Sequence, residues 1–89
     1  MIVGIVKGSL VATRKNEALV GQKLMIVEVL GNTDSAAKKL VATDNVGAGV
    51  GDTVLVACGS AARVGCRLEN APVDAALVGI VDEDQKLDL

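Results

Sequence analysis

Residues 44–63 read DNVGAGVGDTVLVACGSAAR, and this stretch carries the strongest structural signals in the chain. Its glycines at positions 47, 49 and 51 predict a turn in which the backbone passes close to another segment or takes a positive φ. The β-branched and aliphatic residues that follow predict a strand over 52–58. Ser60 stands just after that strand, where its hydroxyl can cap a short helix over 60–65.

The rest of the chain predicts four further strands, over 2–13, 23–30, 39–46 and 73–82. Apolar and polar residues alternate along the first of them, and a period of two is typical of a strand. Gly4 and Gly8 fall on its apolar face, where missing side chains permit a sharp bend or a bulge. Such curvature suits a small barrel. We therefore expect an all-β fold, a small five-stranded OB-like β-barrel with one short helix, made by a single domain over residues 1–89.

The composition predicts that the protein associates with copies of itself. Of the 89 residues 51% are hydrophobic, but none is Phe, Trp or Tyr, the side chains that normally bury the most surface. The strand over 23–30 is largely apolar on both faces, so we expect a neighbouring subunit to cover one of them. Oligomerisation is a standard way to stabilise a domain of this size.

Several classes of function fit the sequence poorly. The chain has no histidine and neither cysteine has an evident activating partner, so we expect no enzyme, no catalytic residue, no metal ligand and no cofactor. The net charge of −2 and the lack of aromatic residues argue against nucleic acid as a partner. No apolar run is long enough to span a membrane, so no membrane partner is expected either. Cys58 lies in an apolar run and is expected to be buried, whereas Cys66 is expected to lie in a loop.

The three glycines at 47, 49 and 51 superficially match the spacing of a dinucleotide-binding loop. That loop must open a helix, so that the phosphate sits at the helix N-terminus. Here the strand over 52–58 follows instead, which argues against nucleotide binding. Two interpretations stay open: an ordinary turn between strands, and close backbone packing near a symmetry axis.

Five motifs, in this order and at these spacings, resemble the EutN/CcmL family of bacterial microcompartment vertex proteins. They are GSLVATRK over 8–15, LVGQKL over 19–24, VATDNVGAGVGDTVL over 41–55, GSAAR over 59–63 and PVDAALVGIVD over 72–82. The resemblance implies a structural protein, a homopentamer that caps the vertices of a carboxysome-like polyhedral shell in the bacterial cytoplasm, beside hexameric shell proteins. The alternative is a small oligomeric OB-like binding module that is not associated with a shell.

Five residues are candidates for a subunit interface or a pore, namely Gly47, Gly49, Ser60, Arg63 and Asp74. The two glycines belong to the central turn, and Asp74 belongs to the last motif. Copies of the helix that begins near Ser60, arranged in a ring, would form a small mouth that attracts anions at a five-fold pore. In the other interpretation Ser60 caps the helix and Arg63 forms an ion pair between subunits.

Overall fold

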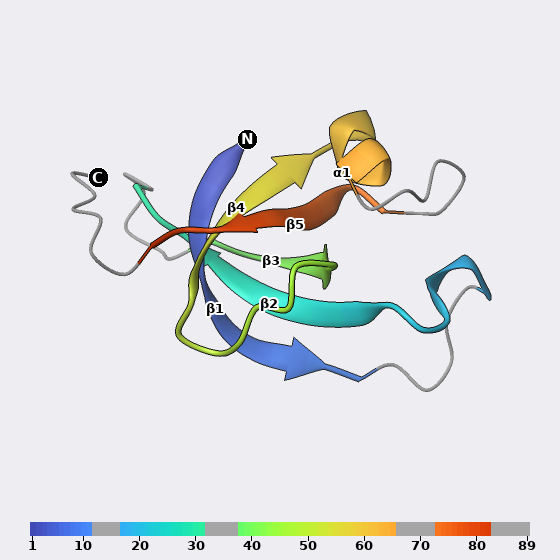
Figure 1. The fold of residues 1–89 in the computed structure, drawn as a ribbon, viewed down its shortest axis with the longest axis horizontal. Coiled ribbons are helices and arrows are strands. Elements are labelled where there is room, and N and C mark those ends of the chain that lie inside the picture. Colours follow the sequence, from blue (N-terminus) through green and yellow to red (C-terminus); the bar gives the residue numbers. More distant parts are fainter. Residues whose placement is uncertain (12–16, 32–37, 66–72, 83–89) are drawn as a thin grey trace.

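Five strands close into a barrel in the computed structural model, which describes residues 1–11, 17–31, 38–65 and 73–82 (Figure 1). The strands are β1 (Ile2–Leu10), β2 (Lys23–Val29), β3 (Lys39–Asp44), β4 (Thr53–Cys58) and β5 (Ala75–Ile80). A short 3-10 helix, η1 (Glu17–Leu19), precedes β2, and the α-helix α1 (Ser60–Gly65) follows β4. The predicted all-β fold, a five-stranded barrel with one short α-helix, is confirmed.

The order of strands around the barrel is β1-β2-β3-β5-β4, so β5 is inserted between β3 and β4. Neighbouring strands are antiparallel, except that β3 and β5 are parallel. Only two residue pairs join β3 to β5, Thr43 with Ala76 and Asp44 with Leu77. The contact between β3 and β5 is therefore the shortest strand pairing of the barrel. The residues of β3 before Thr43 do not pair with β5.

Small aliphatic side chains fill the interior of the barrel. The main core consists of Val6, Met25, Val27, Ala42, Ala48, Val54, Val56, Ala75 and Leu77. A second cluster, formed by Ala62, Val73 and Ala76 with Leu19 packed against it, attaches α1 and η1 to β5. Burial of one Val or Leu side chain contributes about 1.5–3 kcal/mol, so many modest contributions replace the aromatic residues that this chain lacks.

The first strand bends where glycine permits it. Its register with β2 shifts between Val6 and Gly8, which confirms the predicted bulge. At Gly4 the backbone of β2 comes so close that a Cβ atom would lie 2.8 Å from the carbonyl oxygen of Glu28 and would collide with the side chain of Val27. A residue other than glycine at position 4 would therefore push the two strands apart.

The end of the third strand and the cap of the helix differ from the prediction for local reasons. The third strand ends at Asp44 and not at residue 46, because the amides of Val46 and Gly47 turn back to donate hydrogen bonds to the Asp44 carboxylate. The helix begins with Ser60 as its first residue, so Gly59, with a φ of 65°, holds the capping position that was predicted for Ser60.

The predicted burial of Cys58 is wrong, because this thiol is exposed. Cys58 is the last residue of β4, where the strand passes beyond the packed interior that buries Val54 and Val56. Its companion Cys66 and residues 12–13 of the predicted first strand lie outside the described residues.

Candidate assembly surface

The glycine-rich segment 45–52 is a loop that packs against the barrel and is hydrogen-bonded to β1. The amide of Val6 in β1 donates to the carbonyl of Asp52 at 2.9 Å, and the amide of Gly51 donates to the carbonyl of Val6 at 2.8 Å. Earlier in the loop, Ala48 is 1% exposed and belongs to the main core. The loop therefore contributes to the interior and does not hang free in solvent.

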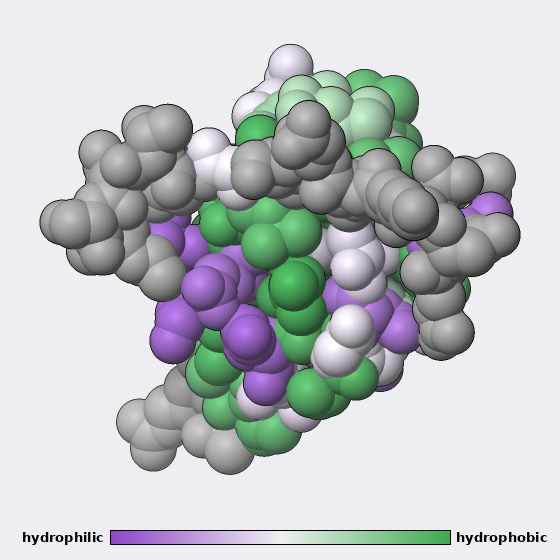
Figure 2. Space-filling model, turned by 90° about the vertical axis from the view of Figure 1, so that its left-hand side faces the viewer, coloured by the Kyte–Doolittle hydropathy of each residue, from purple (hydrophilic) through white to green (hydrophobic). Residues whose placement is uncertain are grey.

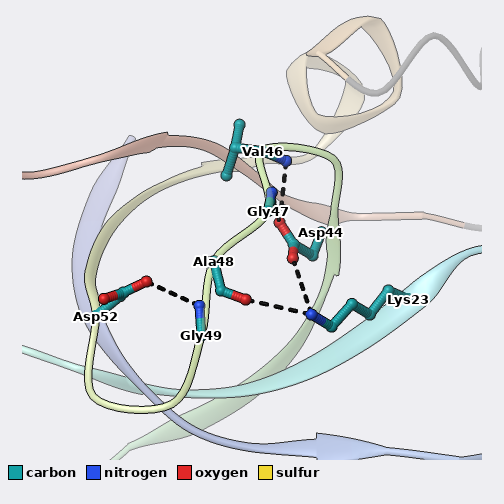
Figure 3. A network of polar contacts seen from close by, with 7 residues as sticks. All are labelled: Lys23, Asp44, Val46, Gly47, Ala48, Gly49 and Asp52. Carbon is teal, nitrogen blue, oxygen red and sulfur yellow. Dashed lines mark hydrogen bonds and ion pairs between the residues drawn. The ribbon is translucent and has the colours of Figure 1, made fainter.

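A buried carboxylate organises the start of this loop (Figure 3). The Asp44 side chain is 1% exposed, and its Oδ1 accepts hydrogen bonds from the amides of Val46 at 3.0 Å and Gly47 at 3.1 Å. Its Oδ2 lies 3.7 Å from Nζ of Lys23, which also donates to the carbonyl of Ala48 at 3.3 Å. Lys23 of β2 thus contacts both the end of β3 and the middle of the loop.

The three glycines of the loop have different roles. Gly47 and Gly51 take φ values of 78° and 94°, in the left-handed region that favours glycine. Gly49 does not have a positive φ, and a Cβ atom there would meet Asp52 at 3.8 Å, an ordinary contact. The sequence predicted that the glycines of this turn are required by a positive φ or by a close approach of the backbone. This prediction is confirmed for Gly47 and Gly51 and is wrong for Gly49 in the single subunit.

The carboxylates of Asp44 and Asp52 already accept from three amides of the loop, which argues further against phosphate binding. The Asp44 carboxylate takes those of residues 46 and 47, and Oδ2 of Asp52 accepts from the amide of Gly49 at 2.8 Å. A phosphate needs such amides free, and it would be repelled by the two carboxylates. Within the described ranges, no group of three or more acidic or cysteine side chains could hold a metal ion. No helix among these residues is long and apolar enough to cross a membrane.

The structure brings the segments of Ser60 and Asp74 together. The amide of Gly59, next to Ser60, donates to the carbonyl of Asp74 at 2.8 Å. At the other end of α1 the carbonyl of Gly65 accepts a hydrogen bond of 2.8 Å from the side chain of Asn45, two residues before Gly47. Helix α1 is therefore held between the glycine loop and the approach to β5. Arg63 lies in α1, and its side chain lies outside the described part of the structure.

A groove beside these segments was not predicted from the sequence. It has a volume of about 220 Å³ and is lined by Leu19, Leu24, Val41, Thr43, Val73, Asp74 and Ala75. A second hollow continues from it past Val41, Asp74 and Ala75 to Leu40, Cys58 and Gly59. The available signal was the apolar outer face of the strand over 23–30, but the sequence could not say which residues of other strands would extend that face.

Exposed hydrophobic residues also occur elsewhere on the barrel. Figure 2 shows green hydrophobic surface between purple hydrophilic residues, on the side that faces left in Figure 1. Over the described residues, nine large hydrophobic side chains are exposed, among them Val50 and Val64, each at 70%. A single subunit therefore leaves substantial apolar surface in water, as the composition predicted.

Comparison with known proteins identifies the family of this chain. The family model described as "Ethanolamine utilisation protein EutN/carboxysome" matches residues 1–82. The bacterial microcompartment shell vertex protein EutN of Escherichia coli (strain K12) is 42% identical over 86 residues, which cover 93% of this chain and 88% of that protein. This chain belongs to the EutN/CcmL family. It is a structural shell vertex protein, and the alternative of an OB-like binding module without a shell is set aside.

Two solved structures of the family have the same fold. CcmL of Nostoc sp. PCC 7120 superposes with a TM-score of 0.82 at 43% identity, covering 92% of this chain and 89% of that chain. The pentameric microcompartment shell protein GrpN from Rhodospirillum rubrum superposes with a TM-score of 0.78 at 42% identity, covering 99% of this chain and 100% of that chain. The similarity thus extends over the barrel, the glycine loop and α1 together.

Proposed function

We propose that five copies of this chain form a closed ring that caps a vertex of a bacterial microcompartment shell in the cytoplasm. The observation that carries the proposal is the match to the pentameric GrpN structure over essentially the full length of both chains. A five-fold tile introduces the curvature that six-fold tiles lack, and it closes the corner of a polyhedral shell. In such a ring each subunit presents one surface to its neighbour and receives a different one, so the contacts are heterologous.

The mass of the assembly tests the ring directly. Native mass spectrometry at micromolar concentration is expected to give a species of five times the 9.0 kDa subunit mass. A stable monomer or dimer under these conditions would contradict the proposal.

The partners of the ring are neighbouring subunits and hexameric shell proteins, and the protein has no catalytic activity of its own. The support is the absence of histidine from the sequence, together with the apolar surface of the subunit. Co-expression with a hexameric shell protein is expected to give closed shells in electron micrographs. Omission of this chain should leave open tubes or sheets, and closed shells without it would argue against a vertex role.

The subunit interface or pore includes the segments that carry Gly47, Gly49, Ser60, Arg63 and Asp74. Arg63 is the single charged residue between Asp52 and Arg67, and several copies near a symmetry axis would repel one another unless carboxylates or small anions pair with them. Substitution Arg63→Ala should weaken the pentamer if Arg63 pairs with a neighbour's carboxylate, and Arg63→Lys should then rescue it only partly. If small anions at the pore pair with it, Arg63→Ala should assemble normally but lose sulfate binding. Normal assembly with unchanged sulfate binding would refute both versions.

A further inference from the structure

We propose that Asn45 is a positioning residue of the ring, which sets the orientation of helix α1 through a hydrogen bond to the last residue of that helix. Nδ2 of Asn45 donates to the carbonyl of Gly65 at 2.8 Å, across 20 positions of the chain. The inference rests on the proposed function, in which α1 presents Ser60 and Arg63 to a neighbouring subunit or to the pore. It assigns to a residue outside that set the task of holding the helix in place.

Helix α1 is too short to be stable without contacts to the rest of the subunit. It has six residues, and isolated helices shorter than about 12–15 residues are marginal in water. At its N-terminal end the amide of Gly59 donates to the carbonyl of Asp74 at 2.8 Å. In its middle Ala62 is fully buried and belongs to one cluster with Val73 and Ala76. Two attachments of this kind leave the helix free to turn about the line that joins them, so a third is needed to fix its orientation.

The third attachment is at the C-terminal end of α1, where Asn45 lies on one side and β5 on another. The last four carbonyls of a helix have no partner within it, so the carbonyl of Gly65 is available to an outside donor. Gly65 also lies close to β5, since a Cβ atom there would be 2.8 Å from Cγ1 of Val78. Glycine allows this close approach, and the Asn45 amide holds the same end of the helix to the loop.

Asn45 is itself held in place by the residues on either side of it. The buried carboxylate of Asp44 accepts hydrogen bonds from the amides of Val46 and Gly47, which closes a tight turn around residue 45. Lys23 of β2 forms an ion pair with the same carboxylate. Contacts therefore run from β2 and β3 through Asn45 to α1, so the position of the helix follows that of the barrel.

The exposure of the Asn45 bond separates this task from a purely structural one. An exposed hydrogen bond replaces one that both groups would form with water, so it adds little to the stability of the subunit. A helix that is already fixed, by contrast, spares the subunit contact the entropy of ordering α1 on binding. We therefore expect loss of the bond to affect assembly more than folding.

Substitution Asn45→Ala tests the role by comparing assembly with folding. It should weaken each subunit contact by roughly two- to tenfold in a dilution series followed by native mass spectrometry, while urea unfolding of dissociated subunits changes little. The control is Lys7→Ala, which removes a polar contact of 3.4 Å between Lys7 and Glu28 that does not involve α1. Unchanged assembly of Asn45→Ala, or an equal weakening by Lys7→Ala, would overturn the proposal. So would a loss of subunit stability large enough to account for the whole loss of assembly.

Substitution Asn45→Asp separates the hydrogen-bond donor from the turn. Asn and Asp both favour turns, but an ionised Asp has no N–H group to donate. Asn45→Asp should therefore weaken assembly as Asn45→Ala does. Assembly like that of the wild type would show that the turn preference of residue 45, and not its bond to α1, is what the ring needs.

Amide hydrogen exchange reports on the bond whether or not a ring forms. In dissociated subunits the amides of α1 should exchange faster in Asn45→Ala than in the wild type, whereas those of β1 and β4 should exchange at the same rates. Equal exchange in α1 would show that Asn45 does not hold the helix, and the proposal would fail on that result alone. If α1 responds as expected but the wild type is not pentameric, the failure is that of the proposed function.

Discussion

Asp44 shows how one buried charge can stabilise the conformation of a loop made largely of small residues. Its carboxylate accepts hydrogen bonds from two loop amides and forms an ion pair with the ammonium group of Lys23. The Lys23 side chain is 54% exposed, so its ammonium group pairs with the Asp44 carboxylate while it remains in contact with water. The sequence showed the glycines but gave no indication that this aspartate holds them in place.

Substitution Asp44→Ala should therefore lower the free energy of unfolding by about 2–3 kcal/mol, because two loop amides and Lys23 lose their partner together. The matched control is Glu28→Ala. The Glu28 pair with Lys7 spans 3.4 Å between side chains that are 29% and 48% exposed, and such surface pairs contribute about 1 kcal/mol or less. Urea unfolding measures the free energy of unfolding of the two variants. Equal losses would show that the buried Asp44 carboxylate stabilises the protein no more than a surface ion pair does.

The loop glycines give a second test at this scale. Substitution Gly51→Ala or Gly47→Ala should destabilise the protein by about 1–2 kcal/mol, because each forces a side chain into a left-handed conformation. Gly49→Ala should change stability by less than about 0.5 kcal/mol, since its φ is not positive and space is available. Thermal unfolding measures all three, and a large effect at Gly49 would show that the ring, and not the subunit, constrains it.

At the scale of the elements, the alternation of side chains predicted the strands well but not where they end. The burial of Val54 and Val56 follows from the period of two of a strand, which is visible in the sequence itself. The end of β3 depends on a side chain that bonds to its own following backbone, and the exposure of Cys58 depends on where the barrel stops. Such ends are set by single local hydrogen bonds or by the extent of the packed interior, and neither has a periodic signature. The groove was missed for a related reason, because it combines residues from segments far apart in the chain.

The bend of β1 offers a test of one element against another. Gly4→Ala should destabilise the barrel by about 1–3 kcal/mol, because the new methyl group would collide with Val27 and the backbone of Glu28. Gly8→Ala is the control, since no atom lies within 4 Å of its Cβ position and its φ is not positive. If calorimetry finds the two variants equally stable, β1 and β2 can separate more easily than their pairing suggests.

At the scale of the whole molecule, the stability of a subunit and the assembly of the ring should be inseparable. The core consists of small aliphatic side chains, and much apolar surface is left for contact with other copies. Because a ring binds folded subunits only, mass action should raise the unfolding temperature as protein concentration increases. Differential scanning calorimetry over a wide concentration range measures this rise. A constant unfolding temperature over this range would mean that subunits are stable alone.

The insertion of β5 between β3 and β4 has a consequence for how the chain is made. On the ribosome the first four strands emerge in an order that lets them pair, since β1 joins β2 and β4 while β2 joins β3. The result is an open sheet with two unpaired edges, which can add a strand from another nascent chain on the same message. Translation from Cys58 to Ile80 takes roughly one to four seconds at ordinary elongation rates. Codons or chaperones that shorten or shield this interval would raise the yield of closed barrels without changing any contact in the finished protein.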